Sequence, residues 1–73
     1  ISYDIKAPGH LSLKIYSVRG ALVRTLLDGP VISSGFVIWD GTDNQGSGVS
    51  SGVYFSEVRM GTEVMVSKMA LVR

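Results

Sequence analysis

A long polar connection in the middle of the chain, residues 40–51, constrains the fold more than any other feature. It is rich in Gly, Asp, Asn and Ser, which favour turns and, for Gly and Asn, tolerate left-handed backbone. An apolar segment ends at Trp39 just before it, and a second apolar segment begins at Val53 just after it. This layout predicts two β-strands joined by a loop.

The size of the chain leaves room for one small domain. With 73 residues, a domain buries only about 60% of its unfolded surface, so we expect a single core of modest stability. The absence of cysteine excludes disulfides, thiolate metal sites and thiol nucleophiles. We expect one domain over residues 1–73, without a cofactor.

Charge and hydropathy exclude two classes of partner. The net charge is only +1 and the basic residues are scattered, so no patch suited to nucleic acid is present. The longest apolar runs, such as residues 36–39, are too short to span a bilayer, and no targeting segment is visible. We therefore expect neither a nucleic-acid partner nor a membrane span.

Alternation of apolar and polar residues recurs along the chain and is cleanest over residues 11–16. A short helix over residues 21–27 is an alternative, but the β-branched Val23 and Thr25 favour a strand there. Gly61-Thr62 predicts a tight hairpin turn. The expected strands are residues 1–6, 11–16, 22–27, 36–39, 53–60 and 63–72, with residues 31–35 as a candidate edge piece.

Turn signals separate these segments. Ala7-Pro8-Gly9 ends the first strand, residues 17–20 form a turn, and Asp28-Gly29-Pro30 ends the third strand. Short strands at this spacing predict an all-β fold, a small antiparallel β-sandwich of six or seven strands.

The core is expected to form from alternating apolar residues of several strands. Trp39 should point inward with Val37, with a partner for its indole N–H. Tyr54, at the start of a strand, should hydrogen-bond nearby backbone through its hydroxyl. The predicted structural core is Leu13, Ile15, Trp39, Tyr54, Val58 and Met69.

Asp40, Asp43 and Asn44 are the only clustered oxygen ligands and thus the only candidates for a metal site. The spacing starts like a Ca²⁺ loop, but Gln45 stands where the loop needs glycine and Ser51 where it needs an acid. We expect Asx turns at Asp40 and Asp43 instead of a metal site.

No catalytic constellation can be assembled from the sequence. His10, the only histidine, follows Pro8-Gly9 at a strand entrance, where a solvated side chain is expected. Nucleophile-elbow and phosphate-loop motifs are absent, and we expect no enzyme activity. The basic residues are assigned to solvated faces or strand edges: Lys14, Arg19, Arg24, Lys68 and Arg73.

Five short motifs stand in order along the chain: residues 13–16 with Gly20, residues 22–26, residues 39–41 with Asp43 and Gly46, residues 51–55, and residues 68–69. Together they resemble the FlgD-type immunoglobulin-like domain. This module is similar to C-terminal domains of many large secreted bacterial proteins, including cargo of the type IX secretion system. The resemblance implies an immunoglobulin-like or fibronectin-III-like sandwich without catalytic activity.

The resemblance also implies a role. The chain is expected to be the C-terminal part of a longer secreted or cell-surface protein, in which it serves sorting, anchoring or surface attachment. Its partners would be the rest of the parent chain or the secretion and anchoring machinery. A structural module that assembles through strand edges is the first alternative. A carbohydrate-binding accessory domain is the second, and it needs Tyr3, Tyr16 and Phe55 to share one face.

Overall fold

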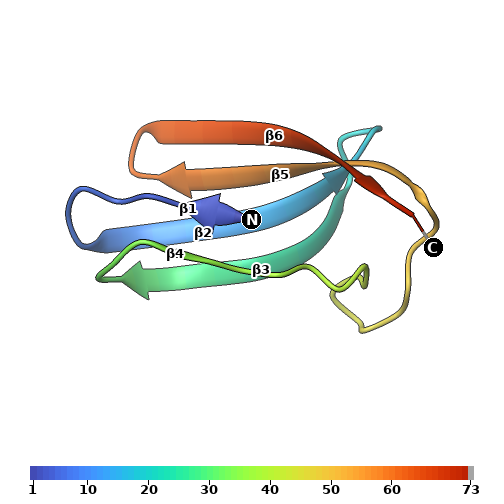
Figure 1. Cartoon of the computed structure of the whole chain (residues 1–73), viewed down its shortest axis with the longest axis horizontal. Helices are drawn as coiled ribbons and strands as arrows, with labels where there is room; N and C mark the ends of the chain where they lie inside the picture. The colour runs from blue at the N-terminus through green and yellow to red at the C-terminus, as the bar shows by residue number, and fades with distance from the viewer. Residues whose placement is uncertain (73) are drawn as a thin grey trace.

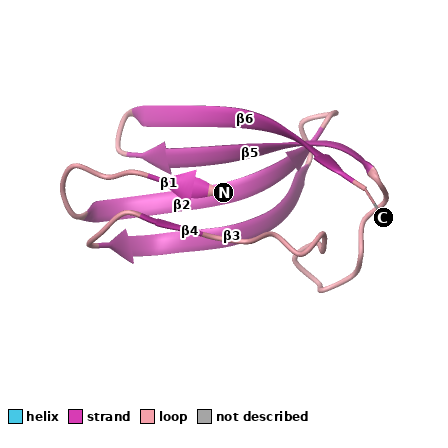
Figure 2. Ribbon diagram, viewed as in Figure 1, coloured by secondary structure: helices cyan, strands magenta, loops and turns pink. Residues whose placement is uncertain are grey.

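The computed structural model describes residues 1–72, and Arg73, one of the five basic residues assigned above, lies outside the described residues. All regular structure within residues 1–72 is β, arranged as two antiparallel sheets in a small sandwich-like domain (Figures 1 and 2). The fold class predicted from the sequence is thereby confirmed. The strands are β1 Ser2–Tyr3, β2 Gly9–Ser17, β3 Leu22–Val31, β4 Gly35–Phe36, β5 Gly52–Met60 and β6 Glu63–Leu71.

The larger sheet has the strand order β3-β2-β5-β6, and the smaller sheet pairs β1 with β4. Two hairpins, β2–β3 and β5–β6, supply the larger sheet, and β2 joins them by pairing with β5 from Leu11–Met60 to Ser17–Tyr54. In Figure 1, β1 and β4 are drawn over β2 and β3, whereas β5 and β6 extend beyond them. The second layer therefore leaves β6 largely uncovered.

The core lies under the small sheet, on the inner face of β2. Leu11 is 1% exposed, and Leu13 and Ile15 are fully buried, because alternate residues of a strand point to the same face. Tyr54 on β5 is 8% exposed and joins this cluster. The other three predicted core residues, Trp39, Val58 and Met69, are only partly buried and pack against the cluster from its margin.

The structure corrects the lengths of the first and fourth expected strands. Of residues 1–6, only Ser2–Tyr3 forms a strand, because β4 offers it just Phe36 and Gly35 as partners. The Ile1–Val37 pair exchanges two further backbone bonds of 2.8 Å. Beyond this pair, Ile38 and Trp39 are not part of a strand. The fourth strand is therefore Gly35–Phe36 instead of 36–39.

The expected end of the third strand is also wrong. β3 continues through Asp28, Gly29 and Pro30 to Val31, opposite Ser12, Leu11, His10 and Gly9 of β2. Pro30 is tolerated because β3 is an edge strand, on which a missing N–H costs no ladder bond. Residues 22–27 are strand and not helix. The expected edge piece over residues 31–35 contributes only the ends of β3 and β4.

The turns and the last two strands follow the sequence closely. Gly61 has a φ of 61° in the two-residue turn between Met60 and Glu63, as the Gly61-Thr62 signal predicts. Gly20 has a φ of 82° and donates its N–H to the Ser17 carbonyl at 2.9 Å. β6 ends at Leu71, one residue before the predicted boundary.

Trp39 and Tyr54 bind the two ends of the long loop. Their rings meet edge to face, with centroids 5.1 Å apart and planes at 67°. The Trp39 indole N–H donates to the Thr42 carbonyl at 2.8 Å, and the Tyr54 hydroxyl donates to the Ser50 carbonyl at 2.7 Å. Both hydrogen bonds expected of these aromatic residues are confirmed, and each one binds the loop to the sandwich.

We predict that Trp39→Ala destabilises the domain by about 3 kcal/mol, the low end for a buried aromatic residue because the indole is partly exposed. The change removes the ring contact with Tyr54 and the bond to the Thr42 carbonyl. Urea unfolding followed by circular dichroism measures it. An unfolding midpoint equal to that of the wild type would contradict this role.

Candidate functional site

The polar loop folds on itself through its carboxylates. Asp43 Oδ1 accepts hydrogen bonds from the N–H groups of Gln45 at 2.9 Å and Ser47 at 3.0 Å. Asp40 Oδ1 accepts from the N–H of Thr42 at 3.2 Å and from its hydroxyl at 2.5 Å. The predicted Asx turns at Asp40 and Asp43 are both present.

Two further side chains fasten this loop to the edge of β3. The Asn44 N–H donates to the Val23 carbonyl at 3.1 Å, and its Oδ1 accepts from the Thr25 N–H at 2.8 Å. Arg24 Nη1 donates to Thr42 Oγ1 at 3.0 Å and to the Asp43 carbonyl at 2.7 Å. Asn44 thus continues the hydrogen-bond ladder of β3 with a single residue.

Arg24 lies on the edge strand β3, as the strand-edge alternative predicts, but it is not a solvated charge. It is partly buried and binds the loop. Its partners lie 18 and 19 residues further along the chain, so no local pattern marks it. The remaining basic assignments within the described residues lie at the surface: Lys14, Arg19 and Lys68 are half-buried or exposed.

The candidate metal ligands are used in hydrogen bonds within the protein. One oxygen each of Asp40, Asp43 and Asn44 accepts a hydrogen bond from a different part of the loop or from β3. Among residues 1–72, no three His, Cys, Asp or Glu side chains gather closely enough to hold a metal ion. A hard cation such as Ca²⁺ requires six to eight oxygens around one point. The loop is attached to β3 by hydrogen bonds.

We predict that Asp43→Ala lowers the free energy of unfolding by about 1–2 kcal/mol, because Gln45 and Ser47 lose a shared acceptor. The melting temperature of the wild type should not respond to Ca²⁺ or to EDTA. Calorimetry with and without each addition tests both points. A rise in melting temperature with Ca²⁺ that disappears in Asp43→Ala would establish a cation site.

A second prediction concerns pH. The Thr42 hydroxyl bound to Asp40 holds the pKa of that carboxyl below its ordinary value of 3.8. Because the folded state binds this proton more weakly, the contribution of Asp40 to stability is present above pH 3.8 and is lost as the pH falls through the lowered pKa. Urea midpoints across acid pH should therefore fall less steeply in Asp40→Asn than in the wild type. Identical profiles would contradict this linkage.

The three aromatic residues of the carbohydrate-binding alternative do not share a face. Tyr16 and Phe55 stand opposite each other in the β2–β5 pairing, on the outer face of the larger sheet. Tyr3 lies on β1 in the smaller sheet and lines the space between the sheets. His10 is exposed on β2, and its Nε2 lies 2.5 Å from Asp28 Oδ1.

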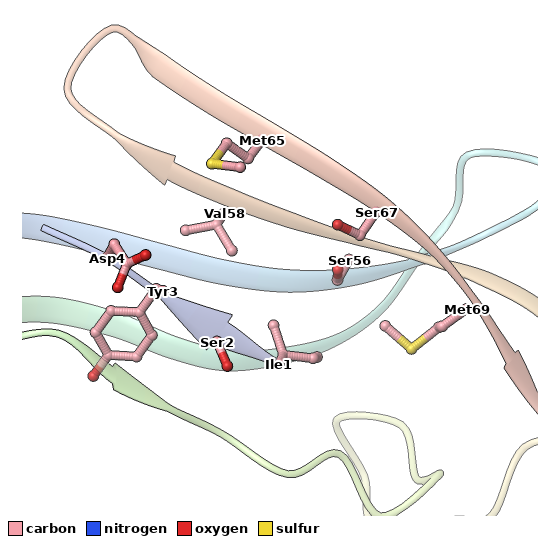
Figure 3. A pocket seen from close by; sticks show the side chains of 9 residues that line it. All are labelled: Ile1, Ser2, Tyr3, Asp4, Ser56, Val58, Met65, Ser67 and Met69. Atoms are coloured by element: carbon pink, nitrogen blue, oxygen red, sulfur yellow. The ribbon is translucent and has the colours of Figure 1, made fainter.

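A groove runs along the inner face of β6 and the adjoining residues of β5. Its first part, about 310 Å³, lies beside β1 and is shown in Figure 3, where Val58, Met65 and Met69 stand on the floor opposite Ile1 and Tyr3. A second part of about 430 Å³ continues towards the turn at Gly61. Asp4, Val58 and Met65 line both parts. The groove exists because β1 and β4 leave the inner face of β6 open.

The two edges of the larger sheet differ sharply. β3 carries two register irregularities opposite β2, Pro30 without an N–H, and Asn44 bonded to Val23 and Thr25. These are the devices that stop an edge strand from pairing with another chain. β6 pairs with β5 in unbroken register over all nine residues and has no proline or bulge.

The free edge of β6 is also apolar on both faces. Val64, Met65 and Val66 are 42%, 72% and 61% exposed, and Lys68 is the only charged residue within β6 after Glu63. A long, regular and apolar edge strand is a ready template for strand addition. The sequence predicts a strand here but not that it lies at an edge, because strand order depends on pairing between distant segments.

Comparisons with protein-family models, with curated proteins and with solved structures find no match to this chain. The resemblance to the FlgD-type domain thus remains a prediction based on short motifs. Within residues 1–72, no helix has the length and apolar character needed to cross a membrane. The free β6 edge and the adjoining groove, taken together, are the candidate functional site.

Proposed function

We propose that the chain is a non-catalytic accessory module of a larger secreted bacterial protein, used for sorting, anchoring or surface attachment. The single observation that supports this role is the unprotected edge of β6, flanked by the groove on the inner face of β5 and β6. An export or anchoring component would bind there by adding a strand. Backbone hydrogen bonds would provide affinity, and apolar side chains in the groove would provide selectivity.

A second candidate function is assembly with an identical or neighbouring domain, with the module acting as a structural part. The exposure of Val64 and Met65, which point to opposite faces of β6, favours this candidate. A partner that continued the sheet would cover both faces at once. Contiguous apolar surface of this kind marks sites of protein association.

The sorting role is tested in the parent protein by replacing Val66 with lysine. A charged side chain at the centre of the edge should block strand addition while leaving the β5–β6 pairing intact, so secretion or surface attachment should fall severalfold. Deletion of the module should cause the same loss. The readout is the amount of parent protein outside the cell and on its surface.

Ile32→Lys is the matched control, because Ile32 is 84% exposed in the bend after β3, away from β6. It makes the same change of side chain and should leave export at the wild-type level. Full export of the deletion variant would refute a sorting role. An equal loss in both lysine variants would show that β6 has no special part in it.

A further inference from the structure

The backbone groups of β6 alternate in direction. A two-residue turn joins Met60 to Glu63, and the pair that closes such a hairpin exchanges both of its backbone hydrogen bonds. Glu63 and every second residue after it therefore bond to β5. The residues whose N–H and C=O groups point away from β5, towards the free edge in the plane of the sheet, are Val64, Val66, Lys68 and Ala70.

We propose that β6 pairs antiparallel with β6 of a second copy of this chain, about a twofold axis between the two Ser67 residues. This inference rests on the assembly role proposed for the β6 edge and names the partner. Val64 then lies opposite Ala70 of the second copy, and Val66 lies opposite Lys68. All four outward-pointing residues of each copy find partners within β6. A shift by two residues would leave one of them without a partner in that strand.

Charge complementarity supports the same register. Glu57 of β5 is the neighbour of Val66 on the outer face, and its Oε1 lies 3.6 Å from Arg59 Nε of the same strand. Lys68 of the second copy lies two strand spacings from Glu57, about 10 Å between backbones, and adds a second cation beside this carboxylate. Extended lysine and glutamate side chains cover this distance across Val66. The twofold axis repeats the contact, so each dimer has two such pairs. A shift to the register centred on Val66 would place Lys68 near Arg59 instead.

The inner faces of both copies lie on the same side of the joined sheet. Met65 therefore stands opposite Met69 of the second copy, on the floor of the groove in Figure 3. This contact covers a side chain that is 72% exposed in the single chain. The grooves of the two copies meet at the seam.

The geometry also closes the assembly at two copies. Each chain has one unprotected edge in its larger sheet, because Asn44, Pro30 and the register irregularities block β3. Pairing through β6 uses that edge in both copies, and a twofold contact between identical surfaces does not propagate. The expected product is an eight-stranded sheet with β3 at both ends.

Cysteine cross-linking tests the register directly, because the chain contains no cysteine. In Ser67→Cys, each thiol meets its own counterpart at the axis, so mild oxidation should convert most of the protein to a covalent dimer. Met65→Cys and Met69→Cys are matched controls on the same face. Neither should cross-link alone, but a mixture of the two should. Equal cross-linking of all three variants alone would overturn the register.

A charge exchange provides a test without covalent bonds. Glu57→Lys and Lys68→Glu each turn both attractions into repulsions and should weaken self-association about tenfold. Mixing the two variants restores opposite charges at both contacts, so the mixture should form heterodimers at the same protein concentrations at which the wild type dimerises. Circular dichroism checks that each variant is folded. No recovery in the mixture would overturn the proposed contact.

Sedimentation equilibrium of the wild-type chain, from micromolar to millimolar concentration, tests the partner itself. A monomer–dimer equilibrium is expected. A monomer at every concentration would overturn the second copy as partner, whatever the result of the export experiment. If export of the parent nevertheless depends on Val66, the strand added at β6 belongs to a different protein. Growth beyond the dimer would overturn the closed geometry.

Discussion

The pairing of β2 with both β3 and β5 is the interaction on which the rest of the structure depends. It joins two local hairpins into one sheet and buries Leu11, Leu13 and Ile15 beneath the small sheet. A chain of 73 residues has little left with which to build a second layer. Only four residues form the strands of the second layer, and they lie over Leu11, Leu13 and Ile15 of β2. The exposure of β6 follows directly from this shortage.

The long loop serves the same architecture. Trp39 and Tyr54 hold its two ends, and Arg24 and Asn44 attach its middle to β3. Its polar groups are used mostly on one another and on neighbouring backbone, which leaves them poorly arranged for a ligand. The same contacts end the sheet on the β3 side. The polar loop, whose composition suggests a ligand site, therefore protects the β3 edge against pairing with another strand.

Much of the fold could be predicted from the sequence, and the failures have a common cause. The alternation over residues 11–16 and the apolar segment that begins at Val53 predict the central strands, and Gly61 predicts the last turn, because these signals are local. The ends of β1, β3 and β4 depend on where a partner strand stops, and no local pattern records that. For the same reason the sequence missed the role of Arg24 and the free edge of β6. Tyr54 was easier, since its hydroxyl partner lies only four residues away.

The separation of the two hairpins has a consequence for folding during synthesis. β2 and β3 are neighbours in the chain and can pair before the loop has been made, whereas β5 becomes available to β2 only after the whole loop has been made. Non-local pairing of this kind is the slow step in β proteins. Until it occurs, the far edge of β2 is as open as the edge of β6 in the finished domain. We expect nascent chains to depend on rapid formation of the β5–β6 hairpin. When β5 pairs with β2, it covers the exposed edge of β2 and leaves β6 as the new exposed edge.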